Sequence, residues 1–384
     1  MISKDKLETV CRAMREAGLD MAVFLDREGA RNPNLAYLTG HPFDAVALIT
    51  ASGERFLFPW DLTLARKKAR DVAIVDPDRT RKGYLGSVVE TIRDLAGDKR
   101  RSLAFPASTP YVTVRQYEKA LPSLRIVCET GGIDRILAEA RAVKSGEELR
   151  ILSEGFAIAD EVIALLPAWL EENKNGTTRE LDLALFLQKE MLDRGTDGAR
   201  EALLVANADR SALVHPHPQA GTAPLFKPGL ALTDFWMRYE EYYTDITVPI
   251  LVEPLTKAQE QIVETVLGVY DDTMKALIPG ASVGEIASRA QDVFAANGLR
   301  PVGGLGHGLG LTGHDAPALR AKPKDDQALA TFRDTALAPG MVLAVEPGVV
   351  HEEHGGFRLE NDVIIGPEKA EIKTHAKPLR VKGA

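Results

Sequence analysis

The chain has 384 residues, of which 45% are hydrophobic and 27% charged, and its formal net charge is -8. This is the composition of a folded globular protein, and the length exceeds that of one ordinary domain, so we expect two domains. The sequence contains no basic stripe for binding nucleic acid and no run of about 18 apolar residues for crossing a membrane. Nucleic acid and membrane are therefore not expected as partners.

The N-terminal residues and the cysteines indicate the cellular compartment in which the protein is expected. Residues 1–20 read as an amphipathic helix that lacks the long apolar segment of a secretory signal. Cys11 and Cys128, the only two cysteines, are too few for a disulfide framework, and we expect both to be small buried side chains. A reducing cytoplasm is the compartment that fits these features.

The first third of the chain alternates between strand-like and helical segments. The strand-like segments are apolar runs at residues 21–26, 45–58, 72–76 and 102–105, the second of which reads as two strands joined by a Ser-Gly turn. Helical spacing marks residues 4–18 and 84–96. The alternation predicts an α/β domain, which we place at residues 1–135.

The remainder, residues 136–384, has a different pattern. A helix-rich stretch at 133–171, with Ser145 and Glu148 as a possible capping box, marks the passage between the domains. Further helices are predicted at 178–194, 256–277 and 282–297, and strands at 202–206, 230–237, 242–252, 341–350 and 356–366. Because hairpins replace strict strand–helix alternation, this part is predicted to be an α+β domain.

Five side chains of the second domain have the chemistry of metal ligands: Asp234, Asp245, His307, Glu346 and Glu360. Each lies in a strand-like apolar stretch or beside clustered glycines. Burying four carboxylates together is costly unless cations neutralise them. Two divalent ions that share bridging carboxylates would do so and would activate a water molecule for hydrolysis. Oxygen ligands with a single imidazole favour Mn, Fe, Co or Zn over metals that thiolates select.

Each ligand has a plainer interpretation. Asp234 and Asp245 lie an odd number of residues apart, so in a regular hairpin they can face each other on one side of a sheet. Alternatively, one of them caps the turn and the other is solvated. His307 alone could be a structural histidine in a glycine-rich turn, and Arg358 could form an ordinary ion pair with one of the two glutamates. The set of five together favours the metal site.

With these residues placed, the sequence resembles the pita-bread metallopeptidases of peptidase family M24, which include methionine aminopeptidase, aminopeptidase P, prolidase and creatinase. The resemblance covers essentially the whole chain. Residues 34–50 resemble the prolidase-type N-terminal domain, and residues 141–152 the start of its catalytic domain. The segments that follow in family order are RSALVHP (210–216), the two-aspartate hairpin, GHGLGLTGHDAP (306–317), VEPGVV (345–350) and GGFRLEND (355–362).

The resemblance implies a pita-bread catalytic domain of the creatinase/aminopeptidase type behind a smaller α/β creatinase-like domain. It also implies a dinuclear metal site and hydrolysis of the Xaa-Pro bond in dipeptides or short peptides. In this arrangement Asp234 binds one ion and Asp245 bridges both. His307 and Glu346 bind the other ion, and Glu360 is the second bridge. Mn is the expected metal, with Co, Fe or Zn as alternatives.

Further roles follow from the same resemblance. Glu346 would also carry protons to and from the bridging water, and His314 would stabilise the tetrahedral intermediate. His215 would contact the scissile amide or the leaving nitrogen, a role that His217 could take if the register differs. Arg358 would orient the site or the substrate carboxylate. A homodimer is expected, in which one of the other histidines, all predicted at the surface or in loops, could reach the partner's substrate: His41, His351, His354 and His375.

Two positions depart from the family pattern. Trp236 stands where a small residue is usual, and Val248 where an arginine is usual; we expect Trp236 to shape a specificity pocket. One alternative is therefore a non-peptidase enzyme of the same fold that acts on a small amide, a cyclic compatible solute or a sulfonium compound. The other is a binding or scaffold protein without catalysis, against which the intact set of ligands argues.

Overall fold

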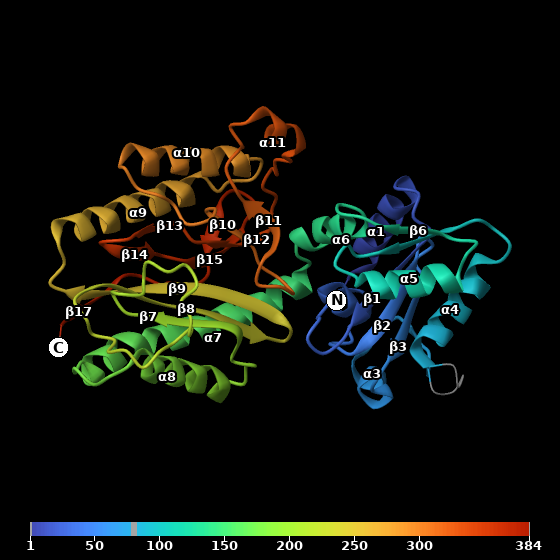
Figure 1. Cartoon of the computed structure of the whole chain (residues 1–384), viewed down its shortest axis with the longest axis horizontal. Coiled ribbons are helices and arrows are strands. Elements are labelled where there is room, and N and C mark those ends of the chain that lie inside the picture. Colours follow the sequence, from blue (N-terminus) through green and yellow to red (C-terminus); the bar gives the residue numbers. More distant parts are fainter. Residues whose placement is uncertain (1, 78–82, 384) are drawn as a thin grey trace. The chain divides into compact units, whose positions relative to one another are not determined.

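A computed structural model describes residues 2–77 and 83–383 (Figure 1). The chain divides into two compact units, Met1–Arg141 and Ala142–Ala384. The predicted boundary after residue 135 falls inside helix α6 (Ile133–Ala142) and stays a prediction. Within the described residues, no helix is long and apolar enough to cross a membrane.

Unit 1 is built on a six-stranded sheet with the strand order β4-β3-β2-β1-β5-β6. β1 pairs with β2 in antiparallel fashion and with β5 in parallel fashion, so the sheet is mixed. Its strands are β1 (Met21–Asp26), β2 (Ala45–Thr50), β3 (Arg55–Pro59), β4 (Ala73–Ile74), β5 (Ser102–Phe105) and β6 (Arg125–Cys128). Its helices besides α6 are α1 (Lys4–Glu16), α2 (Pro33–Thr39), α3 (Leu62–Lys68), α4 (Gly83–Ala96) and α5 (Tyr111–Ala120).

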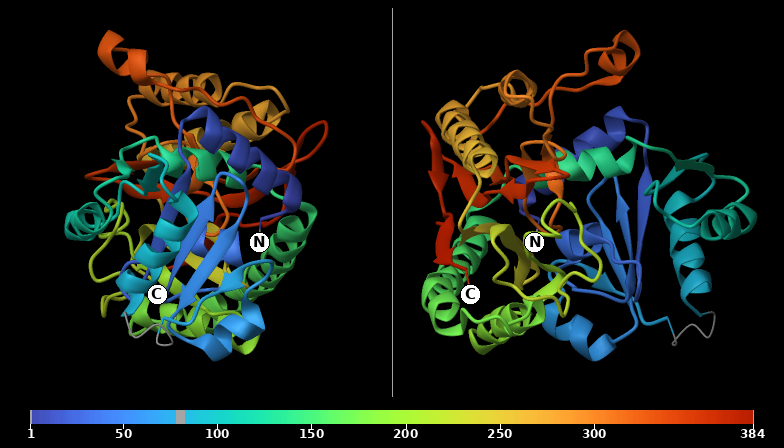
Figure 2. Two further views of the ribbon diagram at one scale, coloured as in Figure 1. Left: turned by 90° about the vertical axis from the view of Figure 1, so that its right-hand side faces the viewer. Right: turned by 60° about the vertical axis from the view of Figure 1, so that its left-hand side comes forward.

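One core of unit 1 lies between this sheet and two helices. Val23, Leu48 and Phe58 from the strands pack with Ile92 of α4 and Tyr117 of α5; Figure 2 shows both helices, in cyan and teal, beside the blue strands. The predicted α/β character is confirmed. The short helices α2, α3 and α5 were not predicted, because each offers at most three turns over which a helical period can repeat.

One prediction about a single side chain of unit 1 is wrong. Cys128 is exposed, because β6 is the edge strand of the sheet, whereas Cys11 is buried as predicted. His41 lies in the loop after α2, in keeping with the prediction of a surface or loop residue, and it is fully buried there. The chain turns inward after Gly40, which ends α2 in the left-handed conformation, and the His41 N–H donates to Thr39 Oγ1 at 3.1 Å. Burial lowers the pKa of His41, so its imidazole is neutral at pH 7.

Unit 2 contains a four-stranded sheet with the order β17-β9-β8-β7. Its strands are β7 (Ala199–Ala206), β8 (Gly229–Tyr239), β9 (Tyr242–Glu253) and β17 (Leu379–Lys382). β8 and β9 form a long hairpin, closed by Glu240 and Glu241, which both have positive φ (46° and 71°) as a two-residue turn requires. Helices α7 (Gly146–Asn173) and α8 (Glu180–Asp193) contact this sheet, and the predicted Ser145–Glu148 capping box begins α7.

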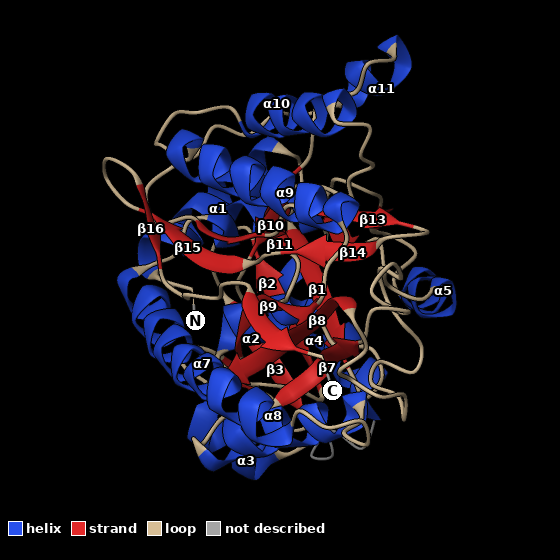
Figure 3. Cartoon of the chain, turned by 90° about the vertical axis from the view of Figure 1, so that its left-hand side faces the viewer, coloured by secondary structure: helices blue, strands red, loops and turns tan. Residues whose placement is uncertain are grey.

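A second sheet of unit 2 has the order β11-β10-β12-β15-β16, and a separate hairpin pairs β13 with β14. The strands are β10 (Gly306–Gly308), β11 (Asp315–Leu319), β12 (Val342–Val345), β13 (Gly348–His351), β14 (Gly355–Arg358), β15 (Asn361–Ile365) and β16 (Ala370–Ile372). Helix α9 (Lys257–Ala276) runs along β13 and β14 and packs against α10 (Val283–Ala296), which reaches β11 (Figure 3). A short helix, α11 (Asp326–Thr331), lies in the loop before β12.

Candidate metal centre

The hairpin β8–β9 places two of the predicted ligands on one face of its sheet. Phe235 pairs with Ile246, and both turn into the apolar core of unit 2. Because side chains alternate along a strand, Asp234 and Asp245 turn to the opposite face. They share that face, as the odd separation predicts, but they lie diagonally and not directly opposite: Asp234 faces Thr247, and Asp245 faces Trp236.

His307 lies in the middle of β10, between β11 and β12. The glycines on either side of it are required by close packing. A Cβ at Gly306, whose φ is 140°, would collide with the carbonyl of Ala344, and a Cβ at Gly308 would collide with that of Ala316. The glycines therefore let three strands approach closely around one imidazole.

Glu346 and Glu360 were interpreted as lying inside apolar strands, and this is wrong. Glu346 follows the last residue of β12, and Glu360 lies in the two-residue break between β14 and β15. Their main-chain N–H groups leave the ladders of their own strands and donate to Leu305 O at 2.9 Å and to Thr247 O at 3.2 Å. Both carboxylates thus sit where strands change direction.

All five predicted ligands converge. The ligand atoms of Asp234, Asp245 and Glu360 lie within 4.8 Å of one another, and so do those of His307, Glu346 and Glu360. Glu360 belongs to both groups of three, which is the arrangement that two neighbouring cations with a shared carboxylate require. His307 Nε2 links the groups, 3.4 Å from Asp245 Oδ2 and 3.5 Å from Glu346 Oε1.

The donor atoms fit divalent cations. Asp234 Oδ1 and Glu360 Oε1 are buried, and neither has a hydrogen-bond partner among the described residues. Burying a carboxylate oxygen without a hydrogen-bond donor is unfavourable unless another group, such as a bound cation, interacts with it. Four carboxylates with one imidazole are hard and borderline ligands, which suit divalent metals such as Mn, Fe, Co or Zn.

The pKa values of the carboxyl groups also indicate that the cluster lacks positive charge when no metal is bound. Burial raises the pKa of Asp234 and Glu346, and raises that of Asp245 and Glu360 well above the usual range. The neighbouring carboxylates raise the pKa further at Asp245 and Glu360, and Arg358 opposes them. One guanidinium therefore only partly offsets four carboxylates.

Arg358 is directed at the cluster. Its Nη2 pairs with Asp234 Oδ2, and its Nε donates to Thr247 Oγ1 at 2.9 Å and lies 3.9 Å from Glu346 Oε2. The alternative interpretation, an ordinary ion pair between Arg358 and one glutamate, is therefore wrong. Arg358 contacts both Asp234 and Glu346, and Asp234 is the nearer of the two. Burial alone would lower the pKa of Arg358, but the surrounding carboxylates outweigh it and raise the pKa, so the guanidinium remains charged.

Two side chains that hydrogen-bond to the ligand residues were not predicted from the sequence. Thr247 Oγ1 donates to Glu360 Oε2 at 2.7 Å, and Asp362 accepts from the Asp245 N–H at 3.3 Å. Burial raises the pKa of Asp362 well above its usual range. Each residue lies two positions after a predicted ligand, in Asp-Ile-Thr and Glu-Asn-Asp, and this strand period could have identified them.

The two predicted catalytic histidines line the cavity that holds the ligands, which has a volume of about 370 Å³. The ring of His314 lies 3.9 Å from that of His307 and 5.1 Å from that of Trp236, measured between centroids. Burial, followed by the nearby His307, lowers the pKa of His314 to about 4, so it is neutral at pH 7. His215 faces this cavity, whereas His217 lines a separate hollow beside α8.

A buried carboxylate holds the loop that carries His215. Glu180 is fully buried at the start of α8, where it accepts from the N–H groups of Asn207 at 2.9 Å and Gly221 at 2.8 Å and pairs with Arg210. These contacts fasten both ends of residues 207–221 to one side chain. The position of His215 therefore depends on Glu180.

Trp236 forms one wall of the cavity, as predicted. Its ring occupies the space that a side chain at residue 313 would need: a Cβ added to Gly313 would lie 2.6 Å from Trp236 Cζ3. The ring of Tyr243 packs against it in an edge-to-face arrangement, at 6.1 Å between centroids. The tryptophan is therefore half-buried and packed between neighbouring residues.

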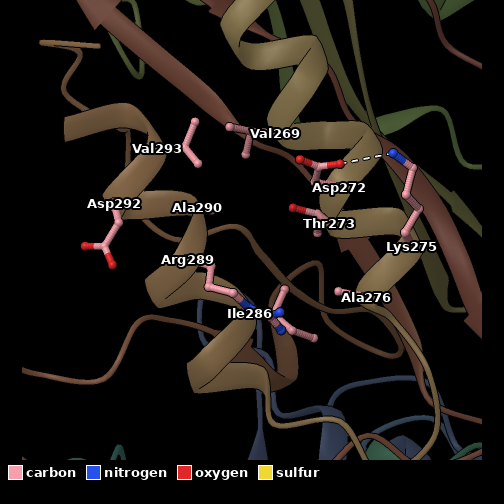
Figure 4. A pocket seen from close by; sticks show the side chains of 10 residues that line it. All are labelled: Val269, Asp272, Thr273, Lys275, Ala276, Ile286, Arg289, Ala290, Asp292 and Val293. Atoms are coloured by element: carbon pink, nitrogen blue, oxygen red, sulfur yellow. Dashed lines mark hydrogen bonds and ion pairs between the residues drawn. The ribbon is translucent and has the colours of Figure 1, made fainter. Parts of the chain in front are cut away.

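A second hollow, between α9 and α10, has a different character (Figure 4). Its volume is about 590 Å³, and its rim carries an exposed Asp272–Lys275 pair at 3.0 Å and the exposed Arg289. None of the predicted ligands lies there. The cavity around His307 is accordingly the candidate site.

Comparison with known proteins identifies the family. Residues 150–367, more than half of the chain, match the model of metallopeptidase family M24. The chain belongs to this family. Residues 6–143 match the creatinase/prolidase N-terminal domain. The predicted fold, a pita-bread domain behind a creatinase-like α/β domain, is confirmed, and the protein is a metal-dependent peptidase.

Individual M24 relatives match along the whole chain. An Xaa-Pro dipeptidase of Pyrococcus horikoshii is 26% identical over 366 residues, which are 95% of each chain. The crystal structure of the prolidase from Pyrococcus horikoshii OT3 superposes with a TM-score of 0.80 at 23% identity, covering 98% of this chain and 99% of that one. For an X-Pro aminopeptidase from Thermotoga maritima MSB8 the TM-score is 0.78 at 22% identity, with the same coverage.

The raised pKa values of the cluster predict an unusual pH dependence for the metal-free protein. Unfolded carboxyl groups titrate near pH 4, so above that pH the folded state binds more protons than the unfolded state, and stability falls as the pH rises. Adding a divalent cation should reverse the slope, because it binds deprotonated ligands. Urea unfolding between about pH 5 and about pH 8, with chelator or with Mn²⁺, measures this; equal slopes would contradict it.

Glu180→Gln should destabilise the protein and displace His215. The amide cannot serve both N–H groups and Arg210, so we expect a loss of about 3 kcal/mol in the free energy of unfolding, with a rise in KM for the substrate. Urea unfolding and steady-state kinetics measure the two effects. Glu171→Gln, which removes the exposed partner of Lys174, is the control and should change neither. A Glu180 variant as stable as the control would refute the role.

Proposed function

We propose that this metallopeptidase hydrolyses the Xaa-Pro bond of dipeptides or short peptides, using two divalent cations held by Asp234, Asp245, His307, Glu346 and Glu360. The convergence of these five side chains on one buried cluster, with Glu360 common to both groups of ligands, carries the proposal. The Xaa-Pro dipeptidase that matches the chain end to end supports the substrate class.

The ligands divide by position. Asp234 belongs to one group and His307 with Glu346 to the other, while Asp245 lies between Asp234 and His307 and is proposed, with Glu360, as a bridge. Cations bound there would lower the pKa of a water molecule to about 7 and polarise the substrate carbonyl. Mn is the proposed metal, and Co, Fe and Zn have the same ligand preferences.

The protein's own groups supply proton transfer and orientation. The side chain of Glu346 is 23% exposed, against 9% for Asp234 and 3% for Asp245, so it is the ligand that reaches into the open cavity. Its raised pKa suits a group that takes a proton from water and passes it on. Arg358 holds Asp234 in place and stays beside Glu346.

The two histidines are placed to act on the substrate amide. His314 is neutral and lies against His307, so one ring N–H can be donated to the carbonyl oxygen as negative charge develops on it. His215 enters from the 207–221 loop, and we propose that it contacts the scissile amide or its leaving nitrogen. Ala202, Leu204 and Trp236 give the cavity an apolar wall against which a proline ring can pack.

Two further features are proposed from the family resemblance. A homodimer is proposed, and light scattering of the purified protein measures it. A cytoplasmic location is also proposed, and both cysteines are free, as a reducing compartment would leave them.

The reaction is tested by restoring single metals to stripped protein. We expect Mn²⁺ or one of its alternatives to restore hydrolysis of Ala-Pro and Gly-Pro but little hydrolysis of Ala-Ala. Asp245→Asn should bind less metal and show no activity under the same conditions. If no metal restores cleavage of any Xaa-Pro peptide, the proposed Xaa-Pro hydrolysis is wrong, and the small amide, cyclic solute or sulfonium substrates become the leading candidates.

Replacing the aromatic wall should change specificity more than metal binding. Trp236→Gly enlarges the cavity next to Gly313, so bulkier substrates should gain relative to Ala-Pro while the metal content stays the same. Trp236→Phe keeps most of the wall and is the matched control. Relative kcat/KM values across a peptide panel, together with metal analysis, measure this. An unchanged profile in Trp236→Gly would show that the ring does not select the substrate.

A further inference from the structure

The hydroxyl group of Thr247 lies between two charged groups of the metal centre. Thr247 is fully buried on β9, directly opposite Asp234 in the β8–β9 hairpin. Its Oγ1 accepts the Nε–H of Arg358 at 2.9 Å and donates to Glu360 Oε2 at 2.7 Å. A guanidinium cannot accept a hydrogen bond, and a hydroxyl has a single proton. The direction of both hydrogen bonds is therefore fixed, and the proton of Thr247 is committed to Glu360.

Thr247 also holds Glu360 through its main chain. The Glu360 N–H donates to Thr247 O at 3.2 Å, at the break between β14 and β15. One residue of β9 therefore contacts both the backbone and the carboxylate of Glu360. Because a β-branched side chain has few rotamers, the Thr247 hydroxyl is itself held in one direction. These contacts together fix the orientation of the Glu360 carboxylate.

The same hydrogen bonds divide the oxygens of two ligands into two kinds. Arg358 Nη2 pairs with Asp234 Oδ2, and Thr247 donates to Glu360 Oε2. The second oxygens, Asp234 Oδ1 and Glu360 Oε1, are buried and have no hydrogen-bond partner in the part of the chain that the structure describes. Each carboxylate is thus anchored to the protein by one oxygen, while its other oxygen is available to a cation.

We propose that Thr247 is a positioning residue for the metal pair: its hydroxyl orients the carboxylate of Glu360 so that two cations bind side by side. The inference rests on the two-cation site of the proposed function. Glu360 is the member common to both groups of ligands, so its orientation affects both cations. Groups that hydrogen-bond to metal ligands typically change metal affinity about 10- to 100-fold when they are removed.

The test is a calorimetric titration of metal-stripped protein with Mn²⁺, without substrate. Thr247→Val keeps the shape of the side chain and removes the hydroxyl, and we expect it to bind the weaker of the two ions about 10- to 100-fold less tightly. Thr247→Ser keeps the hydroxyl and should bind both ions nearly as the wild type does. At two equivalents of Mn²⁺, electron paramagnetic resonance should show fewer coupled ion pairs in Thr247→Val than in the wild type.

Thr244→Val is the matched control. Thr244 is a buried threonine of the same strand, and its hydroxyl donates to Met237 O at 3.5 Å instead of to a ligand. The control should leave both Mn²⁺ affinities unchanged. If Thr247→Val does not fold, as circular dichroism would show, Thr247→Ala takes its place, because it also lacks the donor. An unchanged affinity in the folded variant without the hydroxyl, or an equal loss in Thr247→Ser, overturns the proposal.

A failure of the proposed reaction is distinguishable, because metal binding is measured without substrate. If the wild type binds two Mn²⁺ ions but cleaves no Xaa-Pro peptide, the proposed reaction is wrong, and the comparison of Thr247→Val with Thr247→Ser still decides the role of Thr247. If the wild type does not bind a pair of ions, the two-cation site and the role of Thr247 are both wrong.

Discussion

Four carboxylates share one buried space, and their mutual repulsion is the constraint on which the rest of unit 2 depends. Arg358 and His307 form ion-pair contacts with them, and together these two groups cannot balance four negative charges. Without a metal, burial and mutual repulsion favour the protonated form of these groups, so the pKa values of Asp245 and Glu360 are raised well above the usual range. Burying these carboxylates destabilises the metal-free protein. Bound cations would neutralise them, and the same arrangement would then stabilise the fold and activate a water molecule.

The scaffold keeps the cluster rigid while leaving one side open. The hairpin of β8 and β9 is anchored by its apolar face, and the glycines around His307 let β10, β11 and β12 close in from another direction. Strand breaks at Glu346 and Glu360 turn these carboxylates inward. Loop residues supply the remaining groups, and the buried Glu180 fixes the loop of His215. Asp234, Asp245 and His307 thus lie on strands, Glu346 and Glu360 lie at strand breaks, and His215 and His314 lie on loops beside them.

Much of this arrangement was predictable from the sequence, because polar residues inside apolar segments are rare without a reason. The two aspartates could be assigned to one face from their odd separation, and the capping box of α7 from Ser145 and Glu148. Contacts between distant segments could not be predicted from the sequence, because they arise from tertiary packing, which a local pattern does not encode. Examples are the contact of Thr247 with Glu360, the contact of Glu180 with the 207–221 loop, and the burial of His41. The strand breaks at the glutamates were missed because the residues before them, Val345 and Leu359, continue the apolar pattern of a strand.

The most direct measurement of the central claim is a crystal structure of the protein soaked with Mn²⁺, with anomalous scattering used to locate the ions. The account predicts two peaks roughly 3.5–4 Å apart, with Asp245 and Glu360 contacting both, Asp234 contacting one, and His307 and Glu346 the other. A single peak, or ions bound away from these side chains, would contradict it.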